Sequence, residues 1–304
     1  MHEASWRNEQ SINSILVGKS EPHARQPEKN GLSCSLLGQQ ACQVVVLMRT
    51  FRYGTSESQV GDLYLPALGM PAVVCLLHGG FWRMPYGREE MAAIAADLAS
   101  RGFAVWNIEY RRIGSPGGGW PGTLEDIAAA IDHLAAFATG EAGLDLRRVA
   151  VVGHSAGGHL ALCAAAPRAE ADARFAPRKV VPTAVAGLAA VLDLHATFTL
   201  NAGNNAVSAL LGGSPSQHPI PYAKASPLAL VPLHVRQLIL HGTEDDALPV
   251  EHSRAYVKAA RDAGDSVDYV ELPGMGHMEY LDPASEAHDT LCKWLDIVLA
   301  TQDA

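Results

Sequence analysis

The stretch that decides the fold reads Val149-Ala150-Val151-Val152-Gly153-His154-Ser155-Ala156-Gly157-Gly158-His159-Leu160. Its apolar start predicts a buried strand, and the residues after the serine predict a helix over 156–166. Gly-x-Ser-x-Gly at this junction is typical of a sharp strand-to-helix turn, where glycines two positions away on each side avoid a collision. The positive N-terminal end of the helix favours negative charge beside the serine. The pattern therefore predicts Ser155 as a nucleophile.

A nucleophilic serine needs a histidine base and an acid that orients the histidine, because a free hydroxyl is almost never ionised at neutral pH. In proteins with this type of turn, the acid comes after the serine in the sequence, and the histidine comes after the acid. The predicted strand 237–240 leads into a loop with three consecutive acids, Glu244, Asp245 and Asp246. The spacing His-Gly-Thr-x-Asp-x-x-Leu-Pro favours Asp245, and Asp246 is the alternative.

The base is predicted from its position, since the chain holds 13 histidines. The predicted strand 267–272 ends in a glycine-containing loop that leads to His277. This places the imidazole at the carboxyl edge of the sheet, where open α/β sheets bind their ligands. His288 falls inside the predicted terminal helix and is expected at the surface.

Acyl transfer also requires N–H groups that hold the negatively charged oxygen of the tetrahedral intermediate, an oxyanion hole. The predicted strand 72–77 is followed by His78-Gly79-Gly80-Phe81-Trp82-Arg83, and two glycines let the backbone approach a carbonyl closely. We expect the N–H groups of Gly79 and Gly80, together with that of Ala156, to form this hole.

Outside these stretches the chain alternates strand and helix patterns, with continuous apolar runs of the kind that lie buried on both faces of a parallel sheet. Such repeating units predict an α/β fold with a mostly parallel eight-stranded sheet and helices on both faces. The predicted strands are residues 44–48, 61–66, 72–77, 103–108, 149–152, 185–192, 237–240 and 267–272, and the predicted helices are residues 88–100, 124–137, 156–166, 250–263 and 284–299.

Two segments depart from this alternation. Residues 1–41 are polar and lack sustained periodicity, so we expect a flexible extension that contributes little to the fold, with one domain over 42–304. Residues 195–232 are rich in Pro, Gly and Asn and predict a short cap inserted into the domain. Prolines at this density argue against a long helical lid.

The amino-acid composition limits the kinds of molecule that the protein can bind. A net charge of −9 without clustered basic residues argues against nucleic acid, and no apolar window is long enough to span a membrane. The five cysteines are odd in number and contain no Cys-x-x-Cys pair, so neither a metal site nor a disulfide framework is expected. With no secretory pattern at the start, a cytoplasmic location is the expectation.

The motifs His78-Gly79-Gly80-Phe81-Trp82, Tyr110-Arg111-Arg112 with 119–123, and Gly153–Leu160 together resemble one branch of the α/β-hydrolases. That branch contains carboxylesterases, acetyl xylan and feruloyl esterases and eukaryotic-type kynurenine formamidases. The resemblance spans residues 43–300 and implies a Ser155, Asp245 and His277 triad that needs no cofactor or metal. Phe81 stands where kynurenine formamidases usually have tyrosine.

These observations predict a serine carboxylesterase that hydrolyses small, short-acyl esters. An arylformamidase acting on an N-formylkynurenine-type amide is the alternative, since it uses the same catalytic groups. A catalytically silent binding module is the third possibility, although such proteins typically lose one triad member. The substrate pocket is expected to involve Phe81, Trp82, His154 and Phe198.

Overall fold

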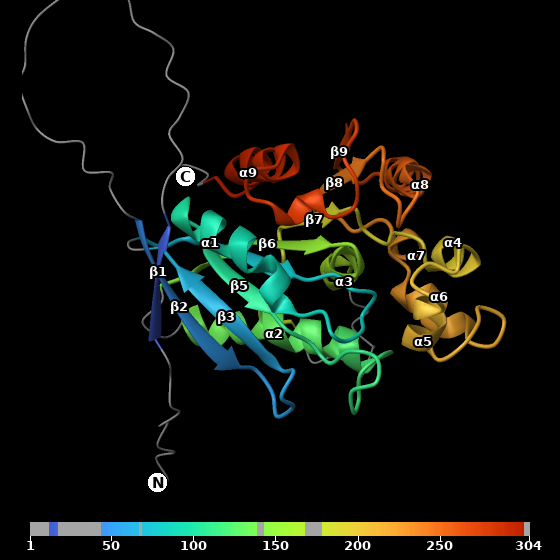
Figure 1. The fold of residues 1–304 in the computed structure, drawn as a ribbon, viewed down its shortest axis with the longest axis horizontal. Helices are drawn as coiled ribbons and strands as arrows, with labels where there is room; N and C mark the ends of the chain where they lie inside the picture. Colours follow the sequence, from blue (N-terminus) through green and yellow to red (C-terminus); the bar gives the residue numbers. More distant parts are fainter. Residues whose placement is uncertain (1–11, 18–43, 67–68, 139–142, 168–177, 301–304) are drawn as a thin grey trace, which may run out of the picture.

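The computed structural model describes residues 12–17, 44–66, 69–138, 143–167 and 178–300 of the chain. Their centre is one sheet in the order β1-β2-β3-β5-β4-β6-β7-β8-β9 (Figure 1). The eight predicted strands correspond to β2 to β9, although the one predicted over 185–192 ends at Leu188. The strands are β1 (Ile12–Val17), β2 (Val44–Arg52), β3 (Val60–Leu65), β4 (Ala72–Leu77), β5 (Ala104–Ile108), β6 (Asp145–His154), β7 (Ala184–Leu188), β8 (Arg236–Gly242) and β9 (Val267–Leu272).

The sheet is mostly parallel. Strands β1, β2, β3 and β5 pair antiparallel in that order, and every later pair from β5 to β9 is parallel. Successive side chains of a strand point to opposite faces. In β4, Val73, Cys75 and Leu77 therefore join one buried core, whereas Val74 and Leu76 join the core on the other face.

Helices cover both faces, as the sequence predicts for the α/β-hydrolase fold. Helices α1 (Ala92–Ser100) and α9 (Glu286–Val298) bury apolar side chains in the same core on one face. Helices α2 (Gly122–Ala138), α3 (Ala156–Ala165) and α8 (Val250–Asp262) contribute to the core on the other. A short 3-10 helix, η1 (Arg88–Met91), precedes α1, and η2 (Glu279–Leu281) precedes α9. Every helix in these described ranges is too short or too polar to cross a lipid bilayer.

The structure corrects the boundary predicted for the N-terminal extension. Residues 12–17, which the sequence analysis left outside the fold, form β1 and pair antiparallel with β2, from Ile12 opposite Arg49 to Val17 opposite Val44. The unpaired edge of β2 offers backbone groups to any extended segment that reaches it, and Ile-Asn-Ser-Ile-Leu-Val is rich in strand-forming residues. The rest of residues 1–41 lies outside the described residues.

The inserted segment folds as four short helices, α4 (Leu194–Thr199), α5 (Ala206–Leu211), α6 (Pro219–Ala225) and α7 (Pro227–Leu230). Helices α6 and α7 each begin at a proline, the position where its missing N–H costs no hydrogen bond. Buried cap residues such as Leu210 and Tyr222 belong to the same core as α2 and α3. The cap is thus packed onto the domain.

Candidate active site

Four strands of the parallel part of the sheet, β4, β6, β8 and β9, deliver the predicted site residues to one edge. The glycine loop follows β4, Ser155 follows β6, and the loops after β8 and β9 carry Asp245 and His277. These strands are parallel, so their carboxyl ends meet at the same edge, where α/β sheets place their ligands.

Ser155 lies on a strained turn between β6 and α3. Its φ of 54° is in the left-handed region, which is unfavourable for a residue with a side chain. The turn leaves no room for side chains beside it. A Cβ on Gly153 would lie 2.1 Å from the carbonyl oxygen of Gly157, and a Cβ on Gly157 would lie 2.1 Å from that of Leu77. The helix therefore starts directly against β4, which brings the glycine loop to the serine.

The structure brings Ser155, His277 and Asp245 together. Nε2 of His277 lies 3.0 Å from the Ser155 Oγ, and Nδ1 lies 2.7 Å from the Asp245 Oδ2. A proton on Nδ1 that is donated to the carboxylate leaves Nε2 free to accept the serine proton, which is the geometry of a general base. The His277 side chain is 10% exposed and that of Asp245 is fully buried.

The carboxylate of Asp245 is held by more than the histidine. Its Oδ1 accepts hydrogen bonds from the N–H groups of Ala247 and Leu248, and its Oδ2 lies 3.2 Å from Nε2 of His241. Burial alone raises the pKa of this carboxyl, but the hydrogen bonds from His241, His277 and Leu248 outweigh it and hold the pKa well below its ordinary value. Asp246, the alternative acid, is exposed to solvent.

His241 is a site residue that the sequence reasoning did not assign. Its ring is fully buried at the end of β8, with Nε2 2.9 Å from the Leu248 carbonyl oxygen and Nδ1 2.6 Å from the Ser253 hydroxyl. These contacts fix the ring against Asp245. The spacing of four residues between His241 and Asp245 was visible in the sequence. The hydrogen-bond partner of a histidine at the end of a strand cannot be predicted from that spacing.

The predicted oxyanion-hole residues lie beside the serine. A Cβ built on Gly79 would lie 3.2 Å from the Ser155 Cβ, so the glycine loop is in direct contact with the turn. Within the described part of the chain, the N–H groups of Gly79 and Gly80 donate to no carbonyl or side chain. Ala156 is the first residue of α3, a position whose N–H has no partner inside the helix.

The four predicted pocket residues fall into two pairs. Phe81 and Phe198 are half-buried, and Phe81 packs on the cap, where a Cβ on Gly203 would lie 2.3 Å from its ring. Trp82 and His154 are 0% and 2% exposed, so neither presents a wall to solvent in this structure. Trp82 instead packs edge-on against the His159 ring, with the ring centroids 5.1 Å apart.

His154 connects two parts of the site. Its Nε2 lies 2.8 Å from the carbonyl oxygen of His277, and the ring centroids of His154 and His277 are 4.9 Å apart. Burial lowers the pKa of His154 to about 4, so the ring is neutral at physiological pH and donates one proton to that carbonyl. The residue before the nucleophile therefore restrains the loop of the base.

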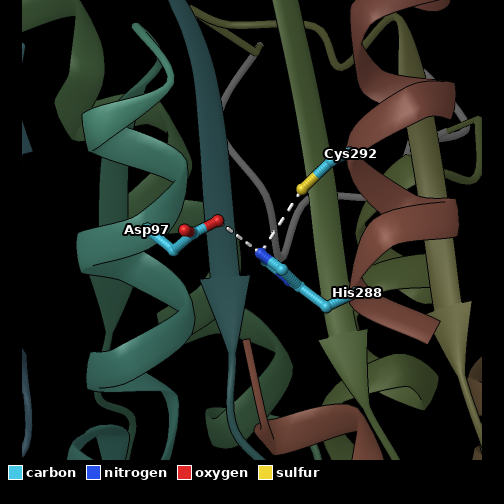
Figure 2. Close-up of side chains that lie close together, drawn as sticks. All are labelled: Asp97, His288 and Cys292. Carbon is cyan, nitrogen blue, oxygen red and sulfur yellow. Dashed lines mark hydrogen bonds and ion pairs between the residues drawn. The ribbon is translucent and has the colours of Figure 1, made fainter. Parts of the chain in front are cut away.

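Asp97, His288 and Cys292, a group of potential metal ligands outside the site, lie between α1 and α9 (Figure 2). Nε2 of His288 lies 2.7 Å from the Asp97 Oδ2 and 3.3 Å from the Cys292 Sγ. The same carboxylate oxygen accepts a hydrogen bond from the Arg101 Nε at 2.6 Å. The His288 nitrogen and the Asp97 oxygen that would bind a metal ion are already hydrogen-bonded to each other, and the Arg101 cation repels a second positive charge. Both features argue against a metal ion here. His288 is 2% exposed, which corrects its expected surface position, and it ties the two helices together.

Comparisons with known proteins bear on this site. The family model described as BD-FAE matches residues 62–259, well over half of the chain. The esterase LipC of Mycobacterium tuberculosis is 29% identical over 250 residues, which are 78% of this chain and 61% of LipC. A probable isoprenylcysteine alpha-carbonyl methylesterase, ICMEL1 of Oryza sativa, is 26% identical over 293 residues, 86% of this chain and 63% of that protein. The chain thus spans about three fifths of these curated relatives.

Solved structures share the fold. A truncated carbohydrate esterase from gut microbiota superposes with a TM-score of 0.71 at 21% identity, covering 83% of this chain and 96% of that one. Esterase B from Lactobacillus Rhamnosis (HN001) also gives a TM-score of 0.71, at 23% identity, with 85% of this chain and 87% of that one covered. Identities this low establish the architecture alone.

Proposed function

The chain belongs to the BD-FAE family, and from that premise we propose that it is a serine carboxylesterase that hydrolyses small, short-acyl esters through an acyl-enzyme on Ser155. The observation that carries the proposal is the continuous chain of contacts from the Ser155 Oγ through His277 to the buried Asp245 carboxylate. The names of the relatives, esterase LipC among them, support an ester as the substrate.

The proposed reaction has two halves. His277 takes the proton of Ser155 as Oγ attacks the ester carbonyl carbon, and the oxygen that becomes negative lies against the N–H groups of Gly79, Gly80 and Ala156. The tetrahedral intermediate collapses, the alcohol leaves with the proton from His277, and the acyl group stays on Oγ. Water then attacks the acyl-enzyme with the same proton transfers, and the carboxylic acid leaves.

The preference for short acyl groups is inferred from the cap. Its four helices contain no more than seven residues each and pack into the domain core, which does not resemble a long mobile lid. A methylene that fits a pocket contributes about 0.8 kcal/mol, whereas one that does not fit costs roughly 1–3 kcal/mol. We expect kcat/KM to peak at about two to four acyl carbons and to fall steeply by about eight.

A series of p-nitrophenyl esters from acetyl to dodecanoyl, run beside N-formylkynurenine, tests this function. The Ser155→Ala variant is the control, because it removes only the nucleophilic oxygen and should lose about 10³-fold or more of the activity. A fluorophosphonate should label Ser155 in the wild type. Rates that keep rising to dodecanoyl would refute the short-acyl preference, and a roughly 100-fold advantage for N-formylkynurenine would establish the arylformamidase alternative instead.

For the setting of the protein we propose the cytoplasm and a small-molecule substrate, with no nucleic-acid partner. Support comes from the net charge of −9 and from Cys75, Cys163 and Cys292, which are free thiols. Cell fractionation with an antibody against the chain checks the location.

A further inference from the structure

The glycine loop is held from behind by a buried tyrosine. Tyr110, two residues after the end of β5, is fully buried, and its hydroxyl donates to the carbonyl oxygen of His78 at 2.9 Å. The same hydroxyl lies 3.4 Å from the carbonyl oxygen of Gly79. One phenolic O–H therefore faces the two consecutive peptide groups that lead into Gly79 and Gly80.

These two peptide groups carry the N–H donors of the proposed oxyanion hole. Both are trans, since the cis bonds in the described chain all precede prolines. In a trans peptide the C=O and the N–H point in opposite directions. A hydroxyl that fixes the carbonyls of His78 and Gly79 on one side therefore fixes the N–H groups of Gly79 and Gly80 on the other.

Glu109 adds a second restraint through the ring of His78. The His78 ring stacks on Tyr110 with centroids 4.3 Å apart, and its Nδ1 lies 3.0 Å from the Gly79 carbonyl oxygen. Its Nε2 lies 3.0 Å from Oε1 of Glu109. Both ring nitrogens thus lie at hydrogen-bond distance from an oxygen acceptor, and the ring connects the Glu109 carboxylate to the Gly79 carbonyl.

The Glu109 carboxylate is itself well anchored. Its Oε1 accepts the N–H of Tyr110 at 2.9 Å, and its Oε2 accepts the N–H of Arg88 at 3.2 Å. The guanidinium of Arg112 lies 3.4 Å from Oε2. Burial alone raises the pKa of Glu109, but its hydrogen bonds and charged neighbours outweigh that effect and lower it. The carboxylate is thus charged and held by several contacts, and Glu109 is only 4% exposed.

We propose that Tyr110 and Glu109 are positioning residues that orient the Gly79 and Gly80 N–H groups toward the oxyanion, an inference that rests on the proposed esterase function. In the described part of the chain, neither side chain hydrogen-bonds to Ser155 or His277. Their effect passes through the His78-Gly79-Gly80 backbone and acts on the transition state, because the negative charge appears on the oxygen only there.

The test compares Tyr110→Phe with Tyr256→Phe. The first variant deletes one oxygen and keeps the ring that stacks on His78. The second deletes an equally buried hydroxyl on α8, which donates to the Oε1 of Gln237 on β8 at 2.7 Å. Both variants lose one buried hydrogen bond, so similar falls in melting temperature are expected. Only Tyr110→Phe should change the chemistry.

Three quantities are measured with p-nitrophenyl acetate: kcat, KM and the inhibition constant of a trifluoromethyl ketone that forms a tetrahedral adduct with the serine. We expect Tyr110→Phe to lower kcat about tenfold, a part of the roughly 10²–10³-fold that one oxyanion donor contributes, with KM nearly unchanged. The inhibition constant should rise by the same factor. Tyr256→Phe should leave all three at wild-type values.

Glu109→Gln is the second variant, since the amide keeps the size and one acceptor oxygen but removes the charge. We expect it to lower kcat and weaken ketone binding in parallel, as Tyr110→Phe does. If the wild type hydrolyses the ester but Tyr110→Phe has the same kcat and the same ketone inhibition constant as Tyr256→Phe, the positioning role is overturned and the proposed function stands. A wild type that hydrolyses no ester and takes no fluorophosphonate label would overturn the proposed function, and this inference with it.

Discussion

Replacing Asp245 by asparagine tests the proposed acid with almost no change in volume. In the structure Oδ1 of Asp245 accepts two hydrogen bonds, at 2.9 Å from Ala247 and at 2.8 Å from Leu248. An asparagine will keep its oxygen at this position, because turning the NH₂ group toward two N–H donors loses both bonds at roughly 1–3 kcal/mol each. The NH₂ group is thereby forced to the Oδ2 position, where it faces Nδ1 of His277.

An amide donor at that position reverses the proton arrangement of His277. Nδ1 must accept the hydrogen bond, so the proton of the neutral ring moves to Nε2, and Nε2 then has no lone pair for the Ser155 proton. Loss of the correct tautomer and of the negative charge should lower kcat by about 10⁴-fold. At 1.36 kcal/mol for each factor of ten, this equals about 5 kcal/mol in the barrier.

The matched control is Asp246→Asn, the neighbouring acid, which is exposed. Steady-state kcat for p-nitrophenyl acetate is measured for both variants, with circular dichroism to verify the fold. Asp246→Asn should retain nearly full activity. If Asp245→Asn kept more than a tenth of the wild-type kcat, or if Asp246→Asn showed the large loss, the assignment of the acid would be wrong.

Three further predictions concern positions outside the triad. His154→Phe keeps a ring but removes the hydrogen bond to the His277 carbonyl, so kcat should fall about tenfold in the same assay; an unchanged kcat would show that the His277 loop holds itself. Deleting residues 1–17 removes β1 from β2 and should lower the melting temperature by about 2–4 °C with kcat preserved; an equal melting temperature would contradict the observed pairing. Hydrogen bonds from His288 and Arg101 outweigh burial and lower the pKa of Asp97, so its stabilising contribution is present above its ordinary value of about 4 and is lost as pH falls through the lowered pKa. Thermal unfolding of Asp97→Asn should therefore show a deficit of roughly 1–3 kcal/mol at neutral pH that shrinks below pH 4, and a deficit that is constant with pH would count against the ion pair.

The strands were predictable because each is long enough to carry its own pattern. The β4 run Ala72–Leu77 is buried along its whole length, and such a run is readable without knowing its neighbours. The turn at Ser155 was equally readable, because the collisions that Gly153 and Gly157 avoid are with their own turn and the adjacent strand. Strand β1 was missed because its pairing depends on β2, more than 25 residues away, and not on a local pattern.

Side-chain partners follow a different rule, and this explains what the sequence did not disclose. Asp245 could be favoured over Asp246 from a local loop pattern, but the role of His241 depends on which face of β8 its ring occupies and on Ser253 in α8. Tyr110 was visible only as part of a motif and Glu109 not at all, because their partners His78 and Gly79 come from a different strand end, 31 or 32 residues away. The parallel pairing of β4 with β5 is what sets these ends side by side. A sequence motif therefore identifies residues that contact the substrate more easily than residues that orient them. The orienting residues depend on tertiary contacts between loops, which the motif does not contain.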